Sequence, residues 1–229
     1  AWNGTGQFEG TEPIRGFGAV AGVYEEACQI VVRADSEIST VEELEGHRVS
    51  VGEEESGTKQ NALQILAAYG LNEKLVEEVS LNYTEAAKEL ENGSIDAFFC
   101  TAGAQTAAIA NLAQRTEIRF LNVDGAAAAR LKKSYPVYDS CIIAAGTYPG
   151  QEEDVSTVGV KAVLLASDSV SAEVVEELTA LLFEEQQELD FALPVELITE
   201  ADAAADGLPV PFHKGAERYY ESRGEKSEN

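Results

Sequence analysis

The sequence is poor in several residue types that mark particular protein classes. Its 229 residues contain no methionine, one tryptophan, two histidines, three cysteines and six prolines. Cys28, Cys100 and Cys141 are far apart, and the chain has neither a CxxC pair nor a Cys/His cluster. Zinc sites need closely spaced ligands, so we expect no metal and no cofactor. The odd cysteine count excludes a full disulfide framework, while a bond between Cys100 and Cys141 stays open as an alternative.

Positive charge is also scarce. Lys and Arg total 16 against 41 Asp and Glu, which gives a formal net charge of −25. Nucleic acid and anionic membrane surfaces would repel such a chain, so neither is expected as a partner. A small anionic solute is not excluded, because nearby backbone N–H groups can outweigh the field of distant carboxylates. No apolar run is long enough for a transmembrane helix, whereas a hydrophobic share of 45% suits a globular core.

Runs typical of strands alternate along the chain with capped, amphipathic runs typical of helices. This alternation predicts an α/β fold, in which a parallel sheet is flanked by helices. The expected strands are residues 19–23, 29–33, 48–51, 76–81, 95–100, 118–123, 140–144 and 159–165. The expected helices are residues 39–44, 61–69, 83–91, an Ala-rich stretch ending at Ala113, 125–134 and 171–189.

The stretch from His47 to Tyr69 predicts a strand, a small polar loop and a helix. Ser56, Gly57 and Thr58 lie where that helix must begin. The first turn of a helix carries unpaired backbone N–H groups and a partial positive charge. Such a terminus binds carboxylates or phosphates, and it also occurs as an ordinary N-cap in α/β loops. Both interpretations stay open on this stretch alone.

Two further loops are candidates for a ligand site. In open α/β sheets, ligands bind outside the carboxyl ends of the strands. Thr101, Ala102 and Gly103 follow one predicted strand and combine a hydroxyl with small residues that let a ligand approach the backbone. Thr147 and Tyr148 lie in the irregular stretch 146–151, where they would supply a donor and an aromatic wall. The alternative for this third loop is a structural turn.

Other function classes find less support in the sequence. For an enzyme, the two histidines, His47 and His213, are isolated from each other, and no GxSxG, HExxH or paired-acid motif occurs. For a phosphate- or nucleotide-binding α/β protein, or an enzyme that uses the same loop, Ser56-Gly57-Thr58-Lys59 is similar to part of a phosphate loop. The full G-x-x-x-x-G-K-[ST] pattern is missing. A structural or adhesive surface protein is the remaining alternative.

Taken in order, several segments resemble the TAXI family of solute-binding proteins, which feed TRAP transporters. They are residues 30–36, 49–52, 56–58, 61–62, 95–99, 101–103 and 145–151. The resemblance runs from Trp2 to Tyr220, and the ordered set is specific although each piece is weak. The chain departs from the family at Glu53-Glu54-Glu55, where small residues are more frequent, and at Ala144, where Pro is frequent. A half-lobe with a Gly-rich ligand loop is missing before Trp2, so the chain is expected to be N-terminally truncated.

The resemblance implies a receptor that is similar to type II periplasmic binding proteins, with two lobes joined by hinge strands. Such a receptor is not an enzyme. It captures a small carboxylate, such as glutamate, glutamine or 2-oxoglutarate, in an interlobe cleft and docks on membrane TRAP permease subunits. It works outside the cytoplasm, in the periplasm or as a surface lipoprotein.

Carried over to this sequence, the resemblance assigns residues 1–29 to a remnant of the first lobe, 30–158 to a central α/β lobe and 159–229 to a return to the first lobe. Apolar side chains of the incomplete lobe are expected to be uncovered. The implied ligand-binding residues are Ser56, Gly57, Thr58, Asn61, Thr101, Ala102, Gly103, Thr147 and Tyr148.

Overall fold

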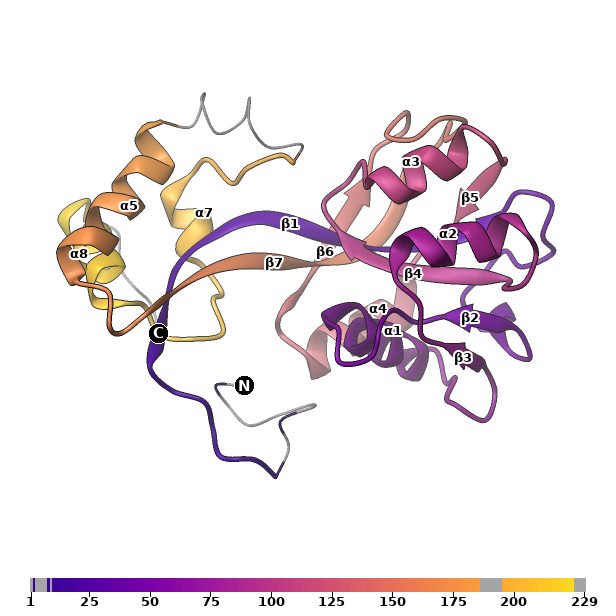
Figure 1. The fold of residues 1–229 in the computed structure, drawn as a ribbon, viewed down its shortest axis with the longest axis horizontal. Helices are drawn as coiled ribbons and strands as arrows, with labels where there is room; N and C mark the ends of the chain where they lie inside the picture. The colour runs from indigo at the N-terminus through magenta and orange to yellow at the C-terminus, as the bar shows by residue number, and fades with distance from the viewer. Residues whose placement is uncertain (1, 3–7, 9, 186–194, 225–229) are drawn as a thin grey trace. The chain divides into compact units, whose positions relative to one another are not determined.

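The computed structural model describes residues 2, 8, 10–185 and 195–224 (Figure 1). The chain divides into two compact units. The continuous unit comprises Glu26–Val160, and the two-segment unit combines Ala1–Glu25 with Lys161–Asn229. The assignment of the outer segments to an incomplete receptor lobe stays a prediction.

The strands form one mixed sheet in the order β3-β2-β4-β1-β7-β6, with β5 also paired to β1. β2 is parallel to β3 and to β4, whereas β1 is antiparallel to β4 and β5, and β6 is antiparallel to β7. The predicted α/β class is therefore confirmed, and the sheet is mixed rather than wholly parallel. The strands are β1 (Phe17–Arg33), β2 (Arg48–Ser50), β3 (Glu77–Val79), β4 (Ala97–Ala102), β5 (Ile118–Phe120), β6 (Tyr138–Ile143) and β7 (Val155–Ser167).

Helices cover both faces of the sheet in the continuous unit. Figure 1 shows α1 and α4 on one face, with α2 and α3 on the other. The side chains of β4 follow this division, because Ala97 and Phe99 join the core under α1 and α4 while Phe98 and Cys100 join the core under α2 and α3. The period of two in a strand thus supplies both cores. These helices are α1 (Gly57–Ala68), α2 (Tyr83–Glu91), α3 (Ala107–Ala113) and α4 (Gly125–Ser134).

The two-segment unit contains the outer parts of β1 and β7 with α5 (Ala172–Glu184), α7 (Ala201–Ala205) and α8 (Lys214–Ser222). Its core gathers Val20, Val175 and the ring of Tyr220. α8 approaches α5 closely, since a Cβ at Gly215 would lie 2.3 Å from the Ala172 carbonyl oxygen. As expected, apolar side chains of α5 are uncovered in the described structure: Val174, Leu178 and Leu181 are 56%, 39% and 46% exposed.

Several sequence expectations need correction. The strand predicted at residues 95–100 is β4 (Ala97–Ala102), so Thr101 and Ala102 belong to the strand instead of following it. The strands predicted at residues 19–23 and 29–33 are parts of the single strand β1. The helix predicted at residues 39–44 is a 3-10 turn, η2 (Glu42–Leu44), and the side chain of Glu43 accepts from the backbone N–H and the hydroxyl of Ser39. β5 ends at Phe120 instead of residue 123. α5 begins after the predicted cap Ser171 but ends at Glu184, and residues 186–189 of the predicted helix lie outside the described residues.

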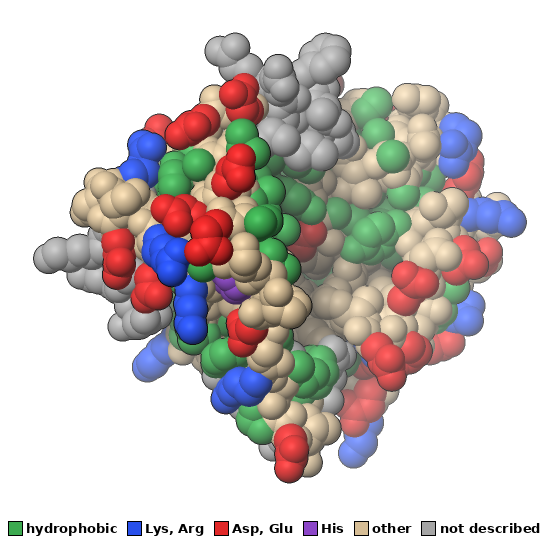
Figure 2. Space-filling model, turned by 60° about the vertical axis from the view of Figure 1, so that its left-hand side comes forward, with side chains coloured by type: hydrophobic (Ala, Val, Ile, Leu, Met, Phe, Trp, Pro, Cys, Tyr) green, Lys and Arg blue, Asp and Glu red, His purple; other side chains and the backbone are tan. Residues whose placement is uncertain are grey.

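The surface matches the acidic composition. Figure 2 shows Asp and Glu side chains spread over the face in view, with fewer Lys and Arg among them. All three cysteines carry thiols, with Cys28 and Cys100 buried and Cys141 half-buried. Among the described residues, the helices are too short or too polar to cross a bilayer.

Candidate functional site

The loop after β2 ends in a well-formed N-cap. Ser56 Oγ accepts from the backbone N–H of Lys59 at 3.1 Å, as the sequence predicted. The backbone N–H groups of Gly57 and Thr58 find no acceptor among the described residues. Within the described residues, the first turn of α1 therefore presents two unpaired donors at the positive end of the helix dipole.

Gly52 is required for this arrangement. Its φ of +99° lies in a region that L side chains rarely adopt, and an added Cβ would lie 2.9 Å from Thr58 Cγ2 and 3.1 Å from Ser56 Oγ. The chain thus turns sharply after β2 and packs its backbone against Thr58. A side chain at this position would push the start of α1 away from the end of the strand.

A cavity of about 570 Å³ lies beside the start of α1. Asn82, which caps α2 through a capping box with Glu85, also lines it, so the cavity is bordered by the beginnings of two helices. In the capping box of α2, the backbone N–H groups of Asn82 and Glu85 donate to side-chain oxygens. The backbone N–H groups of Gly57 and Thr58 have no such acceptor among the described residues. The lining residues are Glu53, Ser56, Thr58, Leu81, Asn82, Tyr83, Thr84 and Glu85.

Tyr83 joins two of the loops that the sequence singled out. Its hydroxyl oxygen lies 2.5 Å from Thr58 Oγ1, and it donates to the backbone carbonyl of Thr101 at 2.9 Å. Burial raises the pKa of Tyr83, so the phenol keeps its proton in the neutral pH range. The start of α1, which comes after β2, and the end of β4 are therefore held together at the carboxyl ends of these two parallel strands.

A second link, between α1 and the end of β4, runs through Cys28 of β1. Asn61 Nδ2 lies 3.5 Å and Thr101 Oγ1 3.6 Å from Cys28 Sγ, and both donate to the sulfur. Thr101 and Ala102 are the last residues of β4, Gly103 follows the strand, and all three are half-buried. The structure thus brings Ser56, Gly57, Thr58, Asn61 and Thr101 to neighbouring positions, although their role in ligand binding stays a prediction.

The third predicted loop is placed differently. Tyr148 is 2% exposed, and its ring stacks on Phe120 with 5.2 Å between ring centroids. Its hydroxyl donates to Gln29 Oε1 at 2.6 Å and accepts from the backbone N–H of Thr106 at 3.0 Å. The expectation that Tyr148 forms an accessible aromatic wall is corrected, because the ring is part of the interior. The hydroxyl of Thr147 donates to the Ala144 carbonyl at 2.6 Å, which suits the structural-turn alternative.

The three consecutive glutamates are exposed, and they are not equivalent. Glu54 Oε1 accepts from Lys59 Nζ and from Ser80 Oγ, each at 2.7 Å, and these bonds lower the pKa of Glu54. Its charge is therefore matched by a cation. Glu55 adopts a φ of +61°, which closes the turn before Ser56. Glu53 is the member of the three that lines the cavity.

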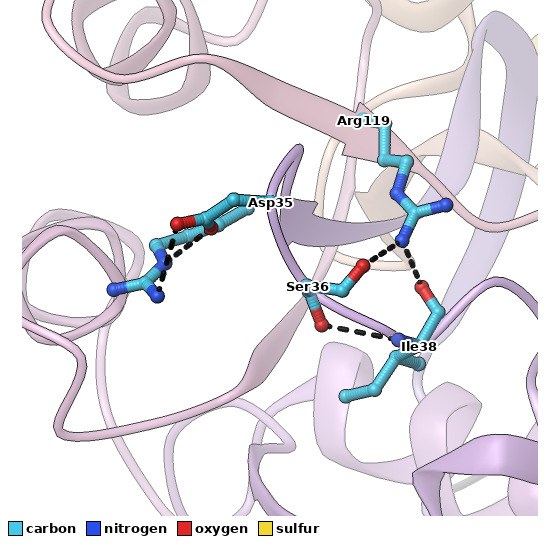
Figure 3. Close-up of polar contacts among 5 residues, drawn as sticks. Asp35, Ser36, Ile38 and Arg119 are labelled. Carbon is cyan, nitrogen blue, oxygen red and sulfur yellow. Dashed lines mark hydrogen bonds and ion pairs between the residues drawn. The ribbon is translucent and has the colours of Figure 1, made fainter.

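A second cavity, of about 530 Å³, lies at the opposite ends of the parallel strands, where His47 precedes β2 and Asp96 precedes β4. His47 Nδ1 lies 3.2 Å from Asp96 Oδ2, and Arg33 is paired with Asp35 at 3.0 Å. Figure 3 shows the neighbouring Arg119 directed at the backbone carbonyls of Ser36 and Ile38. These charged groups are engaged within the unit, and the sequence-predicted ligand residues do not line this cavity.

Sequence reasoning missed the residues that hold the loops together. Tyr83 was assigned only to a helix start, and the buried Gln29 only to a strand. A glutamine inside the apolar run from Ala27 to Val32 was a usable signal, because a buried amide needs hydrogen-bond partners. No local signal pointed to Tyr83, whose partners lie 25 and 18 positions away.

Comparison with solved structures gives distant similarities. The chain is similar to the periplasmic aliphatic sulphonate-binding protein SsuA from Escherichia coli, with 18% identity and a TM-score of 0.46 over 90% of this chain and 65% of that one. It is also similar to a TctC solute-binding protein from Polaromonas, with 17% identity and a TM-score of 0.45 over 77% of this chain and 59% of that one. The chain thus spans less than two thirds of the length of these proteins.

A family model matches far more of the chain than any single motif does. The match extends over residues 1–224 and includes both units as well as every predicted ligand residue. On this match the chain belongs to the NMT1-like family.

Proposed function

We propose that this protein is an extracytoplasmic solute-binding receptor that captures a small carboxylate at the start of α1. The observation that carries the proposal is the pair of unused N–H donors of Gly57 and Thr58 beside a cavity lined by hydroxyl groups. A carboxylate fits such a terminus because its charge and its acceptor oxygens match the dipole and the donors. Ser56 adds a hydroxyl whose own proton is not used by the N-cap.

The type of transporter and the candidate solutes are proposed from the resemblance to TAXI-family receptors. It makes TRAP permease subunits the membrane partner, and glutamate, glutamine or 2-oxoglutarate the candidate solutes. It also suggests that the two-segment unit is the incomplete first lobe and that β1 and β7, which run through both units, are the hinge strands. Thr101, Ala102, Gly103 and Asn61 would border the solute, while Tyr148 and Thr147 would support the loops from behind.

Isothermal titration calorimetry of the full chain with L-glutamate, L-glutamine and 2-oxoglutarate tests the proposal. We expect saturable binding of at least one of them, with the solute recovered unchanged. Solutes that bind at the start of α1 should compete with each other. Their binding should be lost when a substitution displaces the backbone N–H groups of Gly57 and Thr58. Absence of binding for all three would contradict the solute class, and conversion of a solute to product would contradict the receptor function.

The phosphate or nucleotide alternative is tested in the same titration. ATP and inorganic phosphate are added in competition with the bound carboxylate. A phosphate-binding loop would let them displace the carboxylate, whereas the exposed Glu53 at the rim should repel the higher charge of a triphosphate. Displacement by ATP at a lower concentration than by the carboxylates would favour the alternative.

A further inference from the structure

A single direction satisfies both the contact of Tyr83 with Thr58 and its contact with Thr101. A phenol has a single O–H, and the carbonyl oxygen of Thr101, 2.9 Å away, can only accept. The Tyr83 proton is therefore committed to Thr101. The short contact of 2.5 Å between Tyr83 Oη and Thr58 Oγ1 then needs a proton from Thr58.

This direction fixes what Thr58 can offer inside the cavity. Its hydroxyl proton is used by Tyr83, so its remaining lone pairs can only accept from a ligand. Ser56 has the reverse character, because Lys59 N–H occupies a lone pair of Ser56 Oγ and leaves the hydroxyl proton available. At the start of α1, Ser56 thus offers a hydroxyl donor and Thr58 offers a hydroxyl acceptor.

We infer that Tyr83 is a specificity-determining residue, which makes Thr58 an obligate acceptor and so selects solutes that carry a donor group next to the bound carboxylate. The inference rests on the proposed function, because it assigns the polarity of that same site. Glu53, which lines the cavity, adds negative charge and favours a positively charged donor. An ammonium or amide group meets this requirement, while a carbonyl oxygen at the same place would face the lone pairs of Thr58.

The Tyr83→Phe variant removes the acceptor of the Thr58 proton. The Thr58 hydroxyl then becomes free to rotate and donate, so the preference at this position should relax. The matched pair of probes is L-glutamate, which carries an ammonium group on C2, and 2-oxoglutarate, which carries a carbonyl oxygen there. We expect the wild type to prefer L-glutamate, and the ratio of the two dissociation constants to shrink by about tenfold in Tyr83→Phe.

The chain offers a close control for this change. Tyr69 Oη donates to the Asp124 carbonyl at 3.1 Å and accepts from the Asp124 N–H at 2.9 Å, which repeats the donor and acceptor pattern of Tyr83 away from the lining residues. Tyr69→Phe should lower stability in the same way and leave the ratio of dissociation constants unchanged. An equal effect of both variants on this ratio, or no effect of either, would overturn the inference.

Neutron diffraction from deuterium-exchanged crystals locates the two protons without any ligand. We expect deuterium on Thr58 Oγ1 directed at Tyr83 Oη, and deuterium on Tyr83 Oη directed at the Thr101 carbonyl. A Tyr83 deuterium directed at Thr58 would overturn the inference. If the deuterium positions agree while the wild type binds neither probe, the polarity assignment is supported and the solute class of the proposed function is what fails.

Discussion

The hydroxyl of Tyr148 donates to Gln29 Oε1 at 2.6 Å, across 119 positions of the sequence. Gln29 in turn donates through Nε2 to Thr106 Oγ1 at 3.2 Å, and Thr106 Oγ1 donates to the Gly103 carbonyl at 3.0 Å. This buried chain of hydrogen bonds connects β1, the loop after β6 and the loop after β4. It holds the Thr101-to-Gly103 segment in place from inside the unit.

Tyr148→Phe should therefore destabilise the protein. The substitution keeps the ring but leaves Gln29 Oε1 and the Thr106 N–H without a partner in the interior, which costs about 1–3 kcal/mol for an unsatisfied buried group. Guanidinium unfolding measures the loss of free energy. The control is Tyr135→Phe, because Tyr135 is 41% exposed, and that variant should lie within about 0.5 kcal/mol of wild type. Equal stabilities of the two variants would contradict the role of this network.

The second prediction separates the effect of a positive φ at a glycine from the effect of the space around its Cα. Gly52 and Gly46 both have a positive φ, of +99° and +80°, but only the Cβ of an alanine at position 52 would meet neighbouring atoms, at 2.9 Å. Gly46→Ala should cost about 1–2 kcal/mol for the backbone conformation alone. Gly52→Ala should cost about 1–3 kcal/mol more, because Thr58 must move. Solute affinity should fall for Gly52→Ala only, and a similar loss in both would show that the contact with Thr58 is unimportant.

Thr58→Val is the direct test of the site residue. The substitution keeps the shape of the side chain and leaves Tyr83 bonded to Thr101, but it removes the hydroxyl from the cavity. Loss of a hydrogen bond to a charged group costs about 1.5–3 kcal/mol, so calorimetry should record an affinity about ten- to hundredfold lower. Thr116→Val changes a half-buried threonine away from the lining residues and should leave affinity as it is. Unchanged affinity in Thr58→Val would remove Thr58 from the site.

Cys100 gives the stability a pH dependence. Burial raises the pKa of its thiol from 9.0 to about 12 in the folded protein. Between these pH values the unfolded chain releases a proton that the folded chain retains, so the free energy of unfolding decreases as pH rises. The slope is at most about 1.4 kcal/mol per pH unit for one group, and the full contribution of the neutral thiol is present below pH 9.

The measurement is guanidinium unfolding at several pH values from about 8 to about 10. Cys100→Ala should show a shallower decrease with pH than wild type, although its stability is lower throughout because the thiol fills space in the core. Val158→Ala serves as the control, because it removes buried volume without removing a titratable group and should keep the wild-type slope. Parallel curves for wild type and Cys100→Ala would contradict the assignment.

Local sequence signals predicted local structure well. α2 and α4 have the bounds that the sequence suggested, because Asn82 forms a capping box with Glu85 and the run after Asp124 consists of strong helix formers. β1 was predicted as two strands, since the polar segment from Tyr24 to Glu26 interrupts the apolar pattern. The interruption falls where β1 passes from one unit to the other, and a change of surroundings alters the burial pattern without ending the strand.

The candidate site was predictable only in part. The N-cap at Ser56 follows from residues within one helical turn and was found. The contacts of Tyr83 with Thr58 and Thr101 join segments on different elements, and no rule of spacing connects them. The burial of Tyr148 depends on Phe120 and Gln29, which are likewise remote in sequence. Long-range pairing of this kind requires the sheet order, which the sequence pattern alone did not supply.

The division of the chain into two units also affects the order in which they can fold during synthesis. The unit from Glu26 to Val160 is continuous, and it is inserted between the two segments of the other unit. Its residues are translated before Lys161–Asn229, so it can fold first. Residues 10–25, by contrast, must wait for partners in the segment that begins at Lys161. The continuous unit also contains every lining residue of the cavity beside Ser56 and Tyr83, so this site can form before the two-segment unit is complete.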